Sequence, residues 1–223
     1  MPSTNPNILV PVEDPKNDNI IVELASIIAS PLQGELHLIH VAQKDRFDKQ
    51  AILNDLSSIA DNSIQNNVKT SVHVGNSVDI VTEIQSRIKE LSCNMIFMAW
   101  RAEINSISIL ASKNLSLTKD LNLDTLIFKE RNLKKVKRIL VPTGGGPHSI
   151  LGIQIAYDLA QKWGAEIAIL RIARNLNVDN LDPIHKRYCK QLLEDTKVQL
   201  DLLNISAAVH IKSAKHVVPA VTE

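Results

Sequence analysis

Ile8-Leu9-Val10-Pro11 recurs 131 residues later as Ile139-Leu140-Val141-Pro142, and this repeated stretch decides the fold. The same offset matches residues 8–41 to residues 139–172 without a gap, with apolar positions recurring in step. A fixed offset over such a span indicates an internal duplication. The chain is therefore expected to build the same unit twice.

Each copy has the pattern of a strand, a helix and a second strand. The opening run is short and nearly all apolar, as expected of a strand buried on both faces. Apolar residues at helical spacing follow, and then a second apolar run. This order with short links predicts a right-handed crossover in a parallel sheet. Gly34 and Gly164 lie beside the expected helix ends, where a left-handed cap is common.

The first copy continues to alternate after its second strand. This alternation predicts five parallel strands with four helices. The further elements predicted are helix 49–64, strand 68–74, helix 77–91, strand 95–99, helix 112–121 and strand 125–129.

The second copy is shorter. Val209-His210-Ile211 matches Val72-His73-Val74, which gives the second copy a third strand, and the chain then ends before a fourth. We therefore expect an α/β protein with two doubly wound parallel-sheet domains, the second incomplete. Their bounds are 1–130 and 138–223, joined by a charged linker at 131–137.

Composition excludes several functional classes. The chain has 25 Lys and Arg against 24 Asp and Glu, and this balance gives no basic excess for nucleic acid. Cys93 and Cys189 lie far apart, so a disulfide framework is not expected and a reducing cytoplasm fits. No apolar run approaches the roughly 20 residues that span a bilayer. His37 and His40 lie on opposite faces of a strand and cannot share a metal.

The order of these elements resembles the universal stress proteins. The residues that carry the resemblance are Ile8–Val12 followed by Glu13, a helix, Gly34, and a strand that ends at His40-Val41. The stretches Pro11–Pro15 and Pro142–Pro147 are similar to the paired stress-protein domains appended to bacterial amino-acid permeases and cation–chloride cotransporters.

This resemblance implies tandem domains of the HUP type and a non-catalytic regulatory or sensory role. It also implies a cytoplasmic location, tethered to the inner face of the membrane when the parent protein is a transporter. The membrane part of that transporter would then be a partner. The alternative is a nucleotide-binding stress protein that acts as a switch.

Many members of the family bind ATP through a loop after the fourth strand. The motif is Gly, two residues, Gly, nine residues, Gly, then Ser or Thr, because backbone N–H groups must close on phosphates. Here alanine stands at the first two glycine positions, so we expect no cofactor, with ATP as the alternative. The positions that correspond to the nucleotide site are Glu13, Val41, Ala99, Arg101, Ala102, Ser112, Gly144, Gly145 and Gly146.

Three stretches have two interpretations each. Gly144–Gly146 follows a strand and precedes a helix, so it is either a phosphate cradle or a flexible turn. Trp100 and Arg101 either hold a ligand at the end of a strand or cover the surface. The run Lys129–Arg138 is either a solvated linker or a contact with lipid or a partner.

The fifth strand gives a prediction about assembly. The resemblance implies pairing through this strand, and an unpaired strand edge is an association site. We expect a homodimer through Asp124, Thr125, Leu126, Ile127 and Phe128, or pairing of this strand with the missing part of the second copy.

Overall fold

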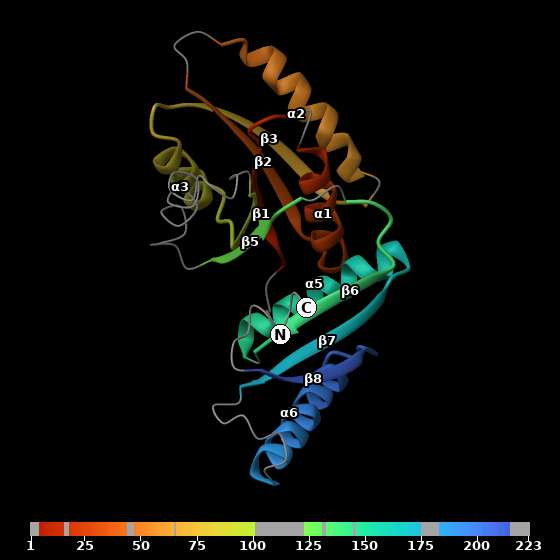
Figure 1. The fold of residues 1–223 in the computed structure, drawn as a ribbon. Coiled ribbons are helices and arrows are strands. Elements are labelled where there is room, and N and C mark those ends of the chain that lie inside the picture. The colour runs from red at the N-terminus through yellow and green to blue at the C-terminus, as the bar shows by residue number, and fades with distance from the viewer. Residues whose placement is uncertain are drawn as a thin grey trace. The chain divides into compact units, whose positions relative to one another are not determined.

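The computed structural model describes residues 5–15, 18–43, 47–64, 66–100, 123–130, 133–144, 146–174 and 183–214. Contacts divide the chain into two compact units, Met1–Leu133 and Lys134–Glu223, and the division falls inside the stretch predicted as a linker. Figure 1 shows the helices and strands of each unit. The predicted helix 112–121 lies outside the described residues.

Unit 1 contains a five-stranded parallel sheet in the order β3-β2-β1-β4-β5. Figure 1 shows α1 and α2 on one side of this sheet and α3 on the other. The elements are β1 (Asn7–Pro11), α1 (Asn19–Ala29), η1 (Ser30–Leu32), β2 (Glu35–Ala42), α2 (Lys49–Ile64), β3 (Lys69–Asn76), α3 (Ile80–Glu90), β4 (Met95–Ala99) and β5 (Asp124–Phe128).

The core of unit 1 lies around its central strand. Ile8, Leu9 and Val10 of β1 have no exposed area, because β2 pairs on one side, β4 pairs on the other and helices cover both faces. On the α3 face, Leu9 packs in one cluster with Ile84 and Ile88. The apolar run that predicted a doubly buried strand is therefore the centre of the sheet.

Unit 2 contains a three-stranded parallel sheet in the order β6-β7-β8. Its register repeats that of unit 1: Ile8 pairs with Leu36, and Ile139 pairs with Ile167. The α/β class and the parallel sheets predicted from the sequence are confirmed. The elements are β6 (Arg138–Thr143), α5 (Pro147–Trp163), β7 (Glu166–Arg174), α6 (Pro183–Leu202) and β8 (Ala208–Ala214).

The sheet of unit 2 has no strand beyond β6 among the described residues. Leu140 on β6 is 49% exposed, whereas its counterpart Leu9 on β1 is 0% exposed and packs against α3. None of the described helices is long and apolar enough to cross a membrane.

The two glycines beside the helix ends act differently from one another. Gly164 is the left-handed cap of α5, with φ of 63°, as predicted. The corresponding prediction for Gly34 is wrong, because the left-handed residue there is Gln33, with φ of 52°. Gly34 is instead required by close approach, since a Cβ at this position would lie 2.3 Å from the backbone oxygen of Pro6.

We expect Gly34→Ala to lower the free energy of unfolding by about 1–3 kcal/mol, because the added methyl group must displace backbone. The matched control is Gly152→Ala inside α5, where nothing lies within 4 Å of the added Cβ. Alanine favours the helix there, so the free energy of unfolding is expected to rise by up to about 1 kcal/mol. Denaturant unfolding measures both, and equal effects of the two substitutions would contradict this account.

Candidate functional site

The carboxyl ends of the strands of unit 1 form one edge of its sheet, here called the carboxyl edge. Open α/β sheets bind ligands at this edge. Glu13, Val41 and Ala99 follow or end the neighbouring strands β1, β2 and β4, so the structure brings these predicted positions to the same edge. Glu13 is exposed, and the other two are partly buried. Arg101, Ala102 and Ser112 lie outside the described residues.

A carboxylate from the same chain fills the loop after β1. Asp18 is 3% exposed, and one of its oxygens accepts hydrogen bonds from the backbone N–H groups of Glu13 (2.9 Å) and Asp14 (3.0 Å). Backbone N–H groups in such loops are the donors that bind phosphate in other α/β proteins. In unit 1 these two donors already hold an anion, and its charge would repel a phosphate.

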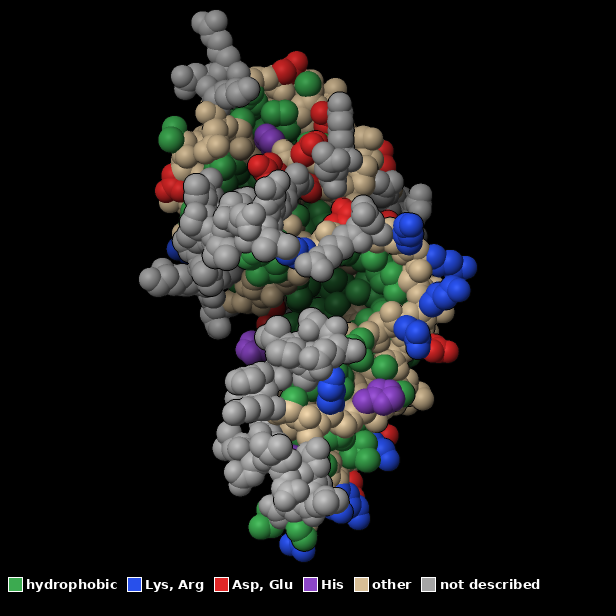
Figure 2. All heavy atoms as spheres, in the orientation of Figure 1, with side chains coloured by type: hydrophobic (Ala, Val, Ile, Leu, Met, Phe, Trp, Pro, Cys, Tyr) green, Lys and Arg blue, Asp and Glu red, His purple; other side chains and the backbone are tan. Residues whose placement is uncertain are grey.

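The start of α3 adds further acidic groups at the same edge. Asp79 caps α3 by accepting from Thr82 N (3.2 Å) and Thr82 Oγ1 (2.6 Å), and these hydrogen bonds lower the pKa of Asp79. Glu83 lies against Gly75, where an added Cβ would be 2.7 Å from Oε1 of Glu83. Acidic side chains gather on this face of unit 1 in Figure 2. The described part of this edge therefore disfavours an anionic ligand.

The corresponding edge of unit 2 has a different charge. At the offset of 131, Glu13, Asp14 and Asp18 are replaced by Gly144, Gly145 and Ser149. Gly146 is the N-cap of α5 with φ of 112°, a backbone conformation that favours glycine, and no side chain caps this helix. Gly145 lies outside the described residues. The positive φ of Gly146 thus explains why glycine stands in this turn. The three carboxylates of unit 1 have no counterpart at the equivalent positions of unit 2.

Arg171 introduces a buried cation at the carboxyl edge of unit 2. It replaces His40, whose Nδ1 donates to the backbone oxygen of Val12 (2.9 Å) in unit 1. The Arg171 residue is 6% exposed and pairs in register with Thr143, the last residue of β6. Within the described ranges, no carboxylate pairs with its guanidinium. The described part of this edge therefore carries a cation where the edge of unit 1 carries carboxylates.

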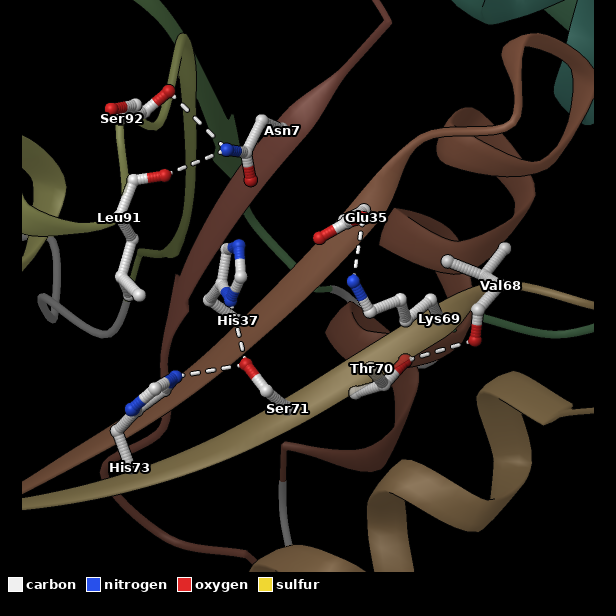
Figure 3. A network of polar contacts seen from close by, with 10 residues as sticks. All are labelled: Asn7, Glu35, His37, Val68, Lys69, Thr70, Ser71, His73, Leu91 and Ser92. Atoms are coloured by element: carbon white, nitrogen blue, oxygen red, sulfur yellow. Dashed lines mark hydrogen bonds and ion pairs between the residues drawn. The ribbon is translucent and has the colours of Figure 1, made fainter.

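A second polar group lies between β2 and β3 of unit 1, at the amino-terminal half of the strands (Figure 3). Ser71 Oγ is 2.6 Å from Nδ1 of His37 and 2.8 Å from Nε2 of His73. The two imidazole rings are 5.8 Å apart. Ser71 and His73 lie two residues apart on β3, and His37 is the cross-strand partner of Ser71. All three therefore lie on the α3 face of the sheet.

Asn7 lies beside this group and is held by its own hydrogen bonds (Figure 3). Its Nδ2 donates to the backbone oxygens of Leu91 (2.9 Å) and Ser92 (3.2 Å). Its Oδ1 and the Nε2 of His37 are both buried, without a partner among the described residues, and Figure 3 shows the amide and the ring facing one another. The Oγ of Ser71 bridges the two rings, since a hydroxyl can donate to one ring nitrogen and accept from the other.

This arrangement favours neutral imidazoles. Burial, followed by the charge of His73, lowers the pKa of His37. Burial, followed by the charge of Arg87, lowers the pKa of His73. We therefore interpret the group as a polar network that fixes β2 against β3. Ser71 was not among the residues predicted from the sequence, although it alternates with His73 on one face of β3.

The network predicts a dependence of stability on pH. The unfolded chain binds a proton near the ordinary histidine value of 6.5, whereas the folded chain binds it at lower pH. The free energy of unfolding is therefore expected to fall as the pH is lowered below 6.5. The free energy of unfolding of His37→Gln should fall less steeply over the same range. His210→Gln, at the exposed counterpart of His73, is the control and should keep the parent slope. Denaturant unfolding at several pH values measures these free energies. An equal dependence on pH in the parent and in His37→Gln would refute this prediction.

The comparisons with known proteins rest on the fold. No protein-family model matches the sequence, and no curated protein matches it significantly. The cytoplasmic domain of a prokaryotic cation chloride cotransporter superposes with a TM-score of 0.65 at 16% identity, over 96% of this chain and 80% of that one. A universal stress protein from Archaeoglobus fulgidus gives a TM-score of 0.56 at 16% identity, over 93% and 77% of the two chains.

A third solved structure gives the same result. A Pseudomonas aeruginosa protein named provisionally as a universal stress protein superposes with a TM-score of 0.64 at 20% identity, over 93% of this chain and 74% of that one. These matches extend over both units, as the resemblance in the sequence implied. The chain therefore has the fold of the universal stress proteins and of the cotransporter's cytoplasmic domain.

Proposed function

We propose that this chain is a non-catalytic regulatory module of the universal stress protein type, attached to a membrane transporter on its cytoplasmic side. The observation that carries the proposal is the likeness to the cotransporter's cytoplasmic domain over 96% of this chain. The reading frame of the encoding gene tests the attachment: apolar segments of about 20 residues are expected beside this chain. A frame without them would contradict the attachment.

The carboxyl edge of unit 1 supports a role that does not use nucleotide. Alanine stands at the first position of the glycine motif, at Ala99. The backbone donors of Glu13 and Asp14 are occupied by Asp18. A module of this kind acts through its surface and its partners, and a change in either would be passed to the transporter.

One observation favours a second candidate, an anion or nucleotide switch in unit 2. Arg171 is buried at the carboxyl edge beside the turn that contains Gly144 and Gly146, where unit 1 has carboxylates instead. A guanidinium binds phosphate through parallel hydrogen bonds, and a helix start carries a partial positive charge. This candidate places the ligand on unit 2 alone.

Calorimetry with ATP, ADP and cyclic nucleotides separates the two candidates. The regulatory proposal predicts no binding tighter than about 10 μM, which corresponds to roughly 7 kcal/mol. The switch predicts tighter binding that Arg171→Gln abolishes and that Arg138→Gln, at an exposed position on β6, leaves intact. Tight binding that survives Arg171→Gln would contradict both assignments.

The outer edge of β5 supports the expected homodimer. β5 is the last strand in the sheet order of unit 1, so one side of its backbone faces no strand among the described residues. Ile127 is 50% exposed on this strand. An open edge with an exposed apolar side chain can pair with a second copy through main-chain hydrogen bonds.

We expect Ile127→Lys to convert the dimer to a monomer, because two charged side chains would meet in the paired edge. Size-exclusion chromatography with light scattering measures the mass of each species. Val78→Lys is the matched control, since Val78 is 89% exposed and lies outside β5. A dimer that persists in Ile127→Lys would contradict pairing through this strand.

A further inference from the structure

Three nucleophilic and titratable side chains meet in unit 2, away from the groups described above. His185 and Cys189 lie one turn apart on α6, and Ser213 lies on β8. The Nε2 of His185 is 2.7 Å from Oγ of Ser213 and 3.5 Å from Sγ of Cys189. The third side of this triangle, from Sγ of Cys189 to Oγ of Ser213, measures 3.9 Å.

The other cysteine of the chain has a contrasting environment. Cys93 is buried in the core cluster under α3, and burial raises the pKa of its thiol to about 11. Cys189 is partly exposed and has an imidazole and a hydroxyl as neighbours. Because the thiolate is the nucleophilic form of cysteine, the two thiols are expected to differ in reactivity, and Cys93 serves as an internal reference.

The triangle can move a proton off the sulfur. The Nε2 of His185 can accept the thiol proton of Cys189, and the imidazole then carries its N–H toward the sulfur. The hydroxyl of Ser213 can rotate to donate to the same sulfur. Two donors therefore face the sulfur once the proton has moved. A metal site does not explain the group, since no three His, Cys, Asp or Glu side chains of the described residues could hold a metal ion.

We propose that Cys189 is a modification site at which a hydroperoxide oxidises the thiol to a sulfenic acid, with His185 as the proton carrier. The thiol proton passes to Nε2 of His185, and the sulfur attacks the terminal oxygen of the hydroperoxide. The S–O bond forms as the O–O bond breaks. Sulfur loses two electrons and the peroxide gains them. The departing alkoxide or hydroxide takes the proton from His185 and leaves as an alcohol or water.

This assignment goes beyond the proposed function, because it adds a covalent input on α6 that requires no ligand at the carboxyl edge. The sulfenic oxygen would enter the space between α6 and β8, where Ser213 lies. Oxidation would thus act on the packing of this helix against the sheet of unit 2.

The test treats the folded full chain with hydrogen peroxide and traps sulfenic acid with dimedone, and peptide mass spectrometry gives the rate at each cysteine. We expect Cys189 to be labelled at least about ten-fold faster than Cys93. His185→Gln, which keeps a polar side chain but cannot carry the proton, should slow Cys189 by about five-fold or more. Ser213→Ala should slow it less.

Two controls make the outcome decisive. His148→Gln, at an exposed position on α5, should leave the rate at Cys189 unchanged. Circular dichroism shows whether each variant is folded, and alkylation in denaturant shows that both thiols react when exposed. Equal rates at the two cysteines of the folded chain would overturn the proposal. A folded His185→Gln variant that reacts as fast as the parent would overturn the role of His185.

Discussion

The burial of β1 on both faces and along both edges is the constraint on which the rest of unit 1 depends. Ile8, Leu9 and Val10 are fully buried, and each such side chain contributes roughly 1.5–3 kcal/mol. Their position between β2 and β4 fixes a parallel order in which all carboxyl ends meet at one edge. The chemistry of that edge is decided by the few residues that follow each strand.

The two units place different chemistry on the same strand register. In unit 1 a buried carboxylate, Asp18, occupies the backbone donors after β1. In unit 2 the equivalent position is Ser149, and Arg171 supplies a buried cation in place of His40. The unit with the complete five-stranded sheet is thus the one that disfavours an anion. The charge of each carboxyl edge is therefore decided by these residues and not by the shared sheet.

The strands were predictable because doubly buried strands leave an apolar run in the sequence, and β4 lies where predicted, at Met95–Ala99. The start of α3 was predicted at Ser77, three residues early, because the cap by Asp79 decides it. The hydrogen bonds that Asp18 accepts depend on the path of a short loop, and the pairing of Ser71 with His37 depends on cross-strand register. The alternation of Ser71 with His73 is visible in the sequence, but the hydrogen-bond partners of Ser71 and Asp18 are not. The need for glycine at position 34 likewise comes from a neighbour in space, the backbone oxygen of Pro6.

The most direct measurement follows the backbone amides of both carboxyl edges while ATP is added to the ¹⁵N-labelled chain. The carboxylate of Asp18 occupies the amides of Glu13 and Asp14, so the account predicts that their NMR signals stay in place throughout the titration. Signals of Glu13 and Asp14 that shift and saturate with ATP would show that phosphate displaces this carboxylate, and the account of unit 1 would be wrong.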